Sequence, residues 1–284
     1  MFVQHAQAEP LVGPRFLVPA VQSQVPLIEQ LCADAEGSAR GEVLSVGLRY
    51  AEFLGWLYQD SGDSGEAMLW TNRALDYAYE LNDPTLSAYV FQRRANIATE
   101  AGHAGYAQSL VNAALNYSGK IPTQVEAVAL RARANAHAAL GNASETARAL
   151  EEARALADKA PGDDEGLAPY VSVEYIDMEA ANCAIALHRP EDAVRTLEES
   201  LTRWPAQQQR DRGLCLARLA TAYALNEDLE GAVNAATQAV SIAQATGSAR
   251  ILAELTRLQT HLEPFRKLVE IAELNQVVGS MKGT

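Results

Sequence analysis

The hydrophobic and polar positions of the chain alternate between long segments at helical spacing and short polar segments. Ala, Leu, Glu, Arg and Gln fill the long segments and β-branched residues are scattered, so helices rather than strands are expected. The short segments contain Gly, Pro, Asp or Asn, which are typical of turns between helices. They recur over residues 59–67, 99–107, 138–147, 186–193 and 224–232. This pattern predicts five helical hairpins in tandem.

Small residues recur in both helices of each predicted hairpin. In the second helices they come in pairs seven residues apart, which is about two helical turns and therefore one face. These pairs are Ala67/Ala74, Ala107/Ala114, Thr146/Ala153, Ala193/Ser200 and Ala232/Ala239. In the first helices the small residues are Gly55, Ala95, Ala134, Ala181 and Ala220. Because each such hairpin packs mainly on its neighbours, the repeats predict an α-solenoid.

This repeat resembles the tetratricopeptide repeat, and the resemblance covers residues 42–246. Leu54 and Tyr58 in the first unit also fit positions of that family. The position after the small residue recurs in steps of 40, 39, 47 and 39 residues, longer than the usual step of about 34. The longest step contains a Pro/Gly/Asp loop at residues 159–170. The resemblance implies an all-α fold, a right-handed α-solenoid of about five helical hairpins with capping helices at both ends.

The two ends of the chain are expected to cover the array formed by residues 41–247. Residues 1–40 are rich in proline and predict an extended lead-in followed by one capping helix. Residues 248–284 predict two further helices, separated by Pro264, and a tail. The apolar residues of the last helix are Phe265, Leu268, Val269, Ala272 and Leu274. This helix either caps the solenoid or serves as a dimerisation or docking helix.

The composition argues against several classes of function. The formal net charge is −13 and the pI is near 4.9, whereas binding to nucleic acid or an anionic membrane relies on Lys and Arg. Cys32, Cys183 and Cys215 are too few and too widely spaced for a disulfide framework or a metal pair. No apolar run approaches the roughly 20 residues of a membrane span, and the first residues lack a signal-peptide pattern. We therefore expect a cytoplasmic protein that binds neither nucleic acid nor membrane by itself.

The sequence lacks the motifs that usually carry catalysis. It has no HExxH, phosphate loop, GxSxG elbow or Gly-rich dinucleotide turn. The five histidines are not spaced like metal ligands. We therefore expect no enzyme activity, no catalytic residue, no metal and no cofactor.

In a tetratricopeptide array the first helix of each hairpin lines the concave surface, and the position after the small residue faces the groove. This position holds Asn96, Asn135 and Asn182, with Trp56 and Thr221 in the remaining units. A carboxamide carries a donor and an acceptor, so a row of them can pair with the backbone of an extended peptide. The resemblance implies this role. The alternative is that the amides bridge neighbouring helices and satisfy buried polar groups.

Helical geometry places further residues beside the asparagine positions. Those expected to complete a peptide-binding groove are Tyr89, Gln92, Arg131, Tyr175 and Met178. Arg131 pairs either with a ligand carboxylate or with an acid of the array such as Glu100. Tyr89, Trp56 and Tyr175 either anchor a ligand or belong to the core and the groove wall.

Two stretches are similar to the C-terminal sensor region of actinobacterial regulators, in which an Xre-type helix-turn-helix precedes a tetratricopeptide array. They are residues 50–102 and residues 219–250. The resemblance implies a regulatory signalling module that binds a peptide or protein segment, as the sensor part of a transcriptional regulator or as its partner. Residues 1–40 are too short and too Pro-rich to supply the DNA-binding unit. The alternatives are a constitutive protein–protein assembly scaffold and an enzyme accessory subunit, both without a ligand in the groove.

Overall fold

The computed structural model describes residues 2–160, 167–204 and 208–281, and within these ranges every regular element is a helix. The hairpins are α4 (Gly37–Asp60) with α5 (Ser64–Glu80), α6 (Pro84–Glu100) with α7 (Ala104–Leu115), α8 (Thr123–Ala139) with α9 (Ala143–Ala157), α10 (Val173–Ala186) with α11 (Pro190–Arg203), and α12 (Gln209–Leu225) with α13 (Leu229–Thr246). The predicted tandem hairpins, and with them the all-α repeat solenoid, are confirmed.

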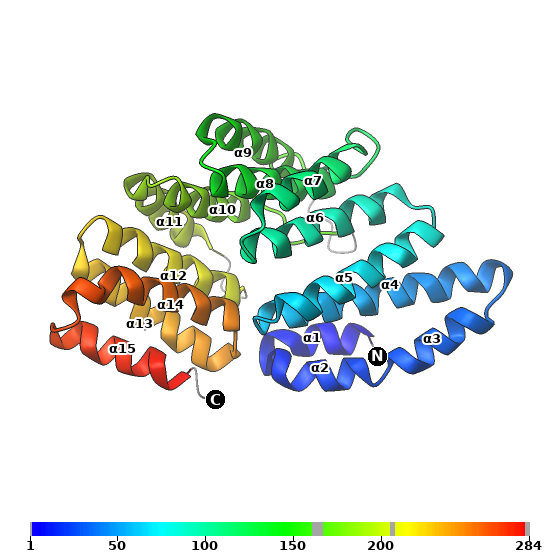
Figure 1. Cartoon of the computed structure of the whole chain (residues 1–284), viewed down its shortest axis with the longest axis horizontal. Helices are drawn as coiled ribbons and strands as arrows, with labels where there is room; N and C mark the ends of the chain where they lie inside the picture. The colour runs from blue at the N-terminus through cyan, green and yellow to red at the C-terminus, as the bar shows by residue number, and fades with distance from the viewer. Residues whose placement is uncertain (1, 161–166, 205–207, 282–284) are drawn as a thin grey trace.

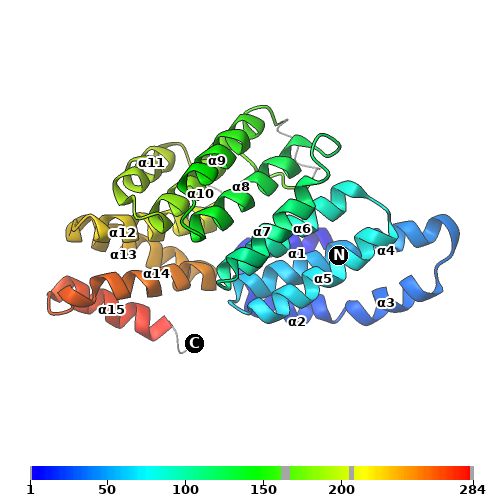
Figure 2. The same ribbon diagram turned by 45° about the horizontal axis from the view of Figure 1, so that its top comes forward.

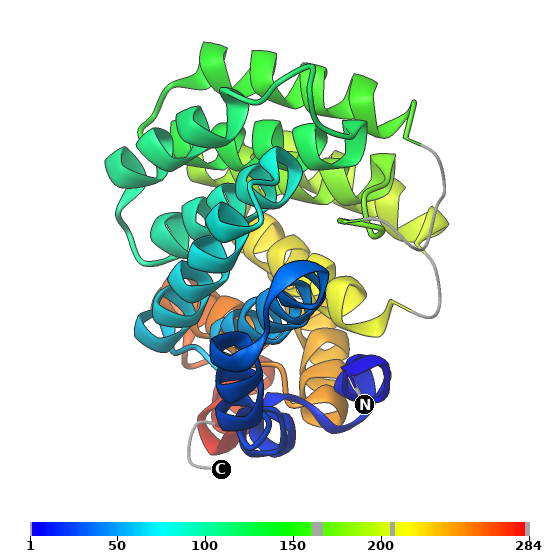
Figure 3. The same cartoon turned by 90° about the vertical axis from the view of Figure 1, so that its right-hand side faces the viewer.

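The hairpins stack side by side into a curved array (Figure 1). Helices α6, α8, α10 and α12, the first helices of their hairpins, contact one another in that order. They form the inner layer, while α7, α9 and α11 lie on the outside (Figure 2). The array curls round so far that its ends meet, and Figure 3 views it from the side of the N-terminal helices. Helix α13 contacts α1 (Phe2–Val12), and α4 contacts α14 (Ala249–Leu262).

The recurring small residues are the packing positions between helices. All ten residues of the second-helix pairs are buried, as are the small residues of the first helices. Gly55 of α4 shows why the positions must be small, because a Cβ atom there would lie 2.5 Å from Thr71 Oγ1 and 3.3 Å from the backbone oxygen of Ala67. The spacing of small residues along the sequence thus sets how closely the helices approach.

Replacing Gly55 with alanine is expected to lower the free energy of unfolding by about 1 kcal/mol. Overpacking against Thr71, worth about 1–3 kcal/mol, outweighs the gain of about 1 kcal/mol in helix propensity. Urea denaturation followed by circular dichroism measures the difference. Gly105→Ala is the matched control, because nothing lies within 4 Å of the Cβ atom that it adds to α7. Equal stability of the two variants would contradict this account of the packing.

Local signals place several helix starts. The side chains of Asp63, Asp83, Ser172 and Asp228 each accept a hydrogen bond from a backbone N–H in the first turn of the helix that follows. Such N-caps stabilise a helix by about 0.5–2 kcal/mol. Gly62 lies in the turn between α4 and α5 and has a φ of 83°. A residue with a side chain would disfavour this conformation. These short-range features explain why the hairpin boundaries could be predicted.

The N-terminal segment differs from the expected extended lead-in, because it folds into three helices. They are α1, α2 (Pro14–Gln22) and α3 (Val25–Asp34). Pro14 is the first residue of α2 and Pro26 the second residue of α3, positions where proline costs no helical hydrogen bond. These two prolines therefore start helices instead of preventing them, while Pro19 lies inside α2. Helices α2 and α3 pack on α4 and cover the first hairpin.

The C-terminal helices continue the stack. Helix α14 packs on α12, and α15 (Val269–Met281) packs on α13 and α14. Pro264 lies in a 3₁₀ turn between them, as expected. Leu274 is buried in α15, but Leu268 and Val269 are exposed. Helix α15 therefore covers the end of the array, and its use in dimerisation or docking stays a prediction.

The chain in the long third step of the repeat returns to the inner face of the array. Residues 161–166 of its predicted loop lie outside the described residues. After them Ala168 is buried, and Leu167, Tyr170 and Val171 pack against the core of the N-terminal hairpins. In the described ranges, no helix combines the length and the apolarity needed to cross a membrane.

Candidate functional site

The inner layer borders a partly open cavity of about 530 Å³. It lies where the curled array brings its two ends together, so that α1, α4 and α6 face α12 and α14 across it. The lining residues are Glu9, Glu52, Trp56, Gln59, Asp60, Tyr89, Arg93, Asn96, Glu100, Arg131, Tyr170, Tyr175, Met178, Gln208, Gln209, Arg210, Asp211, Leu214, Thr246, Ser248, Arg250 and Ile251. Arginines, carboxylates and aromatic rings dominate this set.

Trp56 lines the cavity and contacts three other lining residues. The guanidinium carbons of Arg93 and Arg250 lie 5.4 and 5.2 Å from the centroid of its ring. These cation–π contacts connect α4 with α6 of the next hairpin and with α14 from the far end of the chain. The indole N–H donates to Glu9 Oε1 at 3.4 Å. The Trp56 side chain thus contacts helices from both ends of the solenoid.

Tyrosines line one end of the cavity. The rings of Tyr170 and Tyr175 meet edge to face with centroids 5.1 Å apart, and the guanidinium of Arg131 lies 5.5 Å from the Tyr175 ring. The hydroxyl of Tyr89 donates to Glu52 Oε1 at 3.2 Å. Burial raises the pKa of Tyr89 well above 10.0, with the nearby Glu52 carboxylate raising it further. It also raises the pKa of Tyr175, so both hydroxyls stay neutral at physiological pH.

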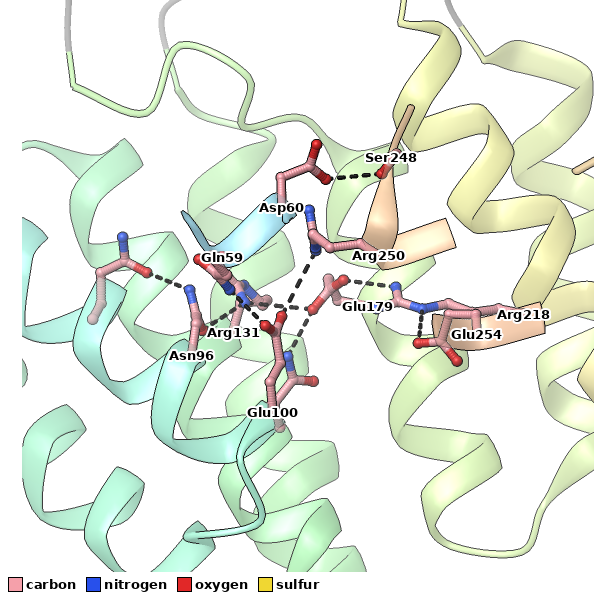
Figure 4. Close-up of polar contacts among 12 residues, drawn as sticks. Gln59, Asp60, Asn96, Glu100, Arg131, Glu179, Arg218, Ser248, Arg250 and Glu254 are labelled. Carbon is pink, nitrogen blue, oxygen red and sulfur yellow. Dashed lines mark hydrogen bonds and ion pairs between the residues drawn. The ribbon is translucent and has the colours of Figure 1, made fainter. Parts of the chain in front are cut away.

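A buried ion network borders the cavity and joins α8, α10, α12 and α14 (Figure 4). Glu179 of α10 accepts from Arg218 Nη1 of α12 at 2.7 Å and pairs with Arg131 Nη1 of α8 at 3.4 Å. Asn135 Nδ2 donates at 2.7 Å to Glu179 Oε2, the oxygen that also pairs with Arg131. Burial alone would raise the pKa of Glu179, but Arg218, Arg131 and these hydrogen bonds outweigh it and lower the pKa to about 2. Arg218 in turn pairs with Glu254 of α14 at 3.8 Å.

Polar contacts also close the array at the ends of α4 and α14 (Figure 4). Ser248 Oγ donates to Asp60 Oδ1 at 2.8 Å. Arg210 Nη2 donates to the backbone oxygens of Glu9 at 2.9 Å and Thr246 at 3.1 Å. Arg210 Nη1 pairs with the carboxylate of Glu9 and lies 3.4 Å from Asp60 Oδ2. Burial lowers the pKa of Arg210 to about 10, which leaves it charged at neutral pH. These contacts hold the first hairpin against the last.

Acid is expected to weaken the fold through Glu179. Its pKa of about 2 lies below the ordinary value of 4.5, so its stabilisation is fully present above about pH 4.5 and is lost as the pH falls from there towards 2. This lowering of the pKa corresponds to about 3 kcal/mol in the free energy of unfolding. Urea denaturation over this acid range should show a shallower pH dependence for Glu179→Gln than for wild type. Glu145→Gln, at an exposed ion pair, is the control and should follow wild type. If the free energy of unfolding depended on pH in the same way for all three proteins, the lowered pKa of Glu179 would be contradicted.

The structure brings six of the ten predicted groove residues to the cavity. They are Trp56, Tyr89, Asn96, Arg131, Tyr175 and Met178. Gln92 is fully buried behind the wall. Thr221 is also buried and donates to the backbone oxygen of Ala217 in its own helix. Asn135 and Asn182 are half-buried and are not among the described residues that line the cavity.

Two of the predicted asparagines bridge helices, as the alternative interpretation held. Asn96 Oδ1 accepts from Arg131 Nη1 at 2.8 Å, and Asn96 Nδ2 donates to Gln92 Oε1 at 3.1 Å. Asn135 donates to Glu179 and accepts from Cys183 Sγ at 3.0 Å. Arg131 likewise pairs with an acid of the array, although that acid is Glu179 rather than Glu100. A role of the asparagines in holding a peptide stays a prediction.

Several cavity residues were not found by reasoning from the sequence. Arg93 lies three residues before Asn96, on the same face of α6, so helical spacing could have indicated it. Arg210 and Arg250 reach the cavity only because the ends of the chain meet, and Glu9 comes from the segment expected to be extended. The periodicity of the repeats does not predict that Arg210, Arg250 and Glu9 line the cavity. Among the described residues, no group of three His, Cys, Asp or Glu side chains is placed to hold a metal ion.

Comparison with solved structures shows the same fold. BtubC (BKLC) from P. vanneervenii is similar with a TM-score of 0.55 at 17% identity, over 81% of this chain and 91% of that chain. A Rap protein in complex with Competence and Sporulation Factor is similar with a TM-score of 0.62 at 11% identity, over 95% of this chain and 83% of that one. A Podosopora anserina putative kinesin light chain with nearly identical TPR-like repeats has a TM-score of 0.46 at 19% identity, over 70% of this chain and 96% of that one.

At these identities the likeness concerns the fold, which is that of a tetratricopeptide-like repeat solenoid. No protein-family model matches the sequence, and a search of curated proteins finds no match. The resemblance to Xre-type regulators stays a prediction. The fold and the site together define a repeat solenoid whose concave face is closed into a polar and aromatic cavity.

Proposed function

We propose that this protein is a binding module that holds a short peptide, or a short segment of a partner protein, in the cavity of its concave face. The observation that carries the proposal is the combination of Trp56, Tyr89 and Tyr175 with the guanidiniums of Arg93 and Arg131 around one partly open cavity. Aromatic and arginine side chains supply much of the binding energy of protein interfaces. The Rap protein of similar fold, solved with a bound factor, supports a ligand role for such an array.

The size of the cavity limits the ligand. A volume of about 530 Å³ is within the range of small-ligand pockets, about 300–1,000 Å³. A folded domain or a long helix does not fit into such a space while the ends of the array are in contact. The proposal therefore favours a ligand that is largely enclosed over one that runs through an open groove.

Regulation follows from the position of the cavity between the two ends of the array. A ligand there contacts α4 and α6 on one side and α12 and α14 on the other, so its binding changes the balance between closed and open forms. This is the property required of a sensor, and we propose such a role as part of, or partner to, a transcriptional regulator. In this proposal the protein binds without catalysis. A constitutive scaffold or enzyme accessory subunit is the alternative, and it leaves the cavity empty.

Replacing Trp56 with alanine is expected to weaken peptide binding at least about 20-fold, the effect of losing one central aromatic anchor worth roughly 2 kcal/mol. Fluorescence anisotropy with a pool of labelled random peptides measures it, with circular dichroism to show that the variant is folded. Leu69→Ala is the control, because Leu69 is exposed on α5. A folded Trp56→Ala variant that binds the pool like wild type, or wild type that binds none of it, would support the scaffold alternative.

A further inference from the structure

The cavity has two ends of different chemistry, and both lie along α4 and α6. At one end Glu52 of α4 pairs with Arg93 Nε of α6 at 3.1 Å. At the other end Gln59 Nε2 of α4 donates to Glu100 Oε2 of α6 at 2.7 Å. Seven residues separate these contacts on each helix, which is about 10 Å at 1.5 Å per residue. The two ends are therefore a defined distance apart.

The first end has hydrogen-bond donors that lack acceptors. Arg93 and Arg131 are 6% and 5% exposed. Arg93 Nη2 and Arg131 Nε are buried and find no hydrogen-bond partner in the part of the chain that the structure describes. The lining carries two guanidiniums here and one carboxylate, that of Glu52. A buried donor without an acceptor is unfavourable, so this end is suited to a ligand carboxylate.

The second end has acceptors that lack donors. Gln59 and Asp60 are 5% and 1% exposed. Across residues 2–160, 167–204 and 208–281, nothing donates a hydrogen bond to Gln59 Oε1 or Asp60 Oδ2, although Arg210 Nη1 lies 3.4 Å from the latter as an ion pair.

The charges at the second end also differ from those at the first. The lining carries four carboxylates, those of Glu9, Asp60, Glu100 and Asp211. Two guanidiniums, those of Arg210 and Arg250, accompany them. Arg210 Nε finds no acceptor among the described residues either, but the excess charge remains negative. This end is therefore suited to an ammonium group.

We propose, on the basis of the peptide-binding function above, that the ligand is a peptide of about three or four residues with both termini free. Its carboxylate lies against Arg93 and Arg131, and its ammonium group lies against Gln59 and Asp60. An extended peptide advances about 3.3 Å per residue, so three or four residues span the separation of the two ends. A single amino acid is too short to reach both. Trp56, which lies between Glu52 and Gln59 on α4, contacts the intervening side chains.

The test is affinity selection with mass spectrometry on the full chain. One pool of random tetrapeptides is offered with free termini, and the same pool is offered N-acetylated, C-amidated or capped at both ends. A pool of ten-residue peptides is run in parallel. We expect retention of the free tetrapeptides, and a loss of at least about tenfold on capping either end, since each cap removes a charge-assisted hydrogen bond.

Two variants assign each terminus to its end of the cavity. Asp60→Asn keeps the acceptor for Ser248 but removes the charge, and it should abolish the preference for a free ammonium group only. Glu52→Gln/Arg93→Gln, compared with Glu52→Gln alone, should abolish the preference for a free carboxylate only. Each comparison measures selectivity within one folded variant, so a change in overall stability does not produce it.

The outcomes separate this inference from the proposed function. Retention of capped and free tetrapeptides alike, or of ten-residue peptides alone, would overturn the recognition of both termini and leave peptide binding in place. Retention of no peptide in any pool would overturn both. Loss of both preferences in both variants would show that the two termini are not bound at the assigned ends.

Discussion

Replacing Glu179 with alanine is expected to lower the free energy of unfolding by about 3–5 kcal/mol. The substitution leaves Arg131 and Arg218 buried without their shared carboxylate, and removing one partner of a buried ion pair costs this much. It also removes the acceptor of Asn135 Nδ2. Urea denaturation followed by circular dichroism at neutral pH gives the value. Because the network connects α8, α10 and α12, the whole array should lose stability in one transition.

Glu145→Ala is the control for this effect. Glu145 pairs with Arg148 one turn away on the exposed surface of α9, where an ion pair contributes about 0–1 kcal/mol. A loss of less than about 1 kcal/mol for Glu179→Ala would contradict the view that the network supports the array. A large loss for both variants would show that the method does not separate buried from exposed pairs.

Replacing Arg210 with alanine is expected to open the array and to cost about 3 kcal/mol. Its guanidinium donates hydrogen bonds to the backbone oxygens of Glu9 and Thr246 and lies beside the buried carboxylate of Asp60. Hydrogen bonds to a charged group contribute about 1.5–3 kcal/mol each, and Asp60 would lose its nearest cation. Small-angle X-ray scattering should show a larger radius of gyration, because the first and last hairpins separate.

Arg266→Ala is the matched control. Arg266 forms an ion pair with Glu263 on the surface beyond α14, so its loss should change neither dimensions nor stability by more than about 1 kcal/mol. An Arg210→Ala protein with the dimensions of wild type would show that the ends stay closed without this side chain. In that case packing of α14 on α4, and of α1 on α13, holds them together.

The tandem hairpins could be predicted because their determinants are local. Ala95, Ala134 and Ala181 recur in the first helices, and each is buried in the structure as the pattern requires. Caps such as Asp83 and Ser172 fix helix starts within one turn of chain. Such signals repeat with each unit, so the sequence shows them several times over.

The N-terminal helices could not be predicted on the same basis. Proline density indicated an extended segment, but proline in the first turn of a helix is tolerated, and Pro14 and Pro26 lie there. Packing on α4 then decides the structure of this segment. The prediction failed because the number of prolines was weighed without their positions relative to the helix starts.

The site was predicted in part. Trp56, Tyr175 and Met178 follow from helical geometry within a repeat, and they line the cavity. Of the three predicted asparagines only Asn96 lines the cavity, and Asn96 and Asn135 are engaged by Arg131 and Glu179 from neighbouring helices. The sequence does not show whether a polar side chain pairs with a ligand or with a polar group of a neighbouring helix. Nor does it show that the curvature of the array brings distant arginines into one cavity.

Photo-crosslinking tests the central claim most directly, namely that a short peptide is enclosed by the concave face. A pool of short random peptides, each with one benzophenone side chain and free termini, is irradiated with the protein, and the attachment sites are mapped by mass spectrometry. The account predicts crosslinks in α4, α6, α10 and α14, at or beside Trp56, Arg93, Tyr175 and Arg250, which an excess of unlabelled pool abolishes. Crosslinks confined to the outer helices α5, α7, α9 and α11, or none that the unlabelled pool displaces, would contradict it.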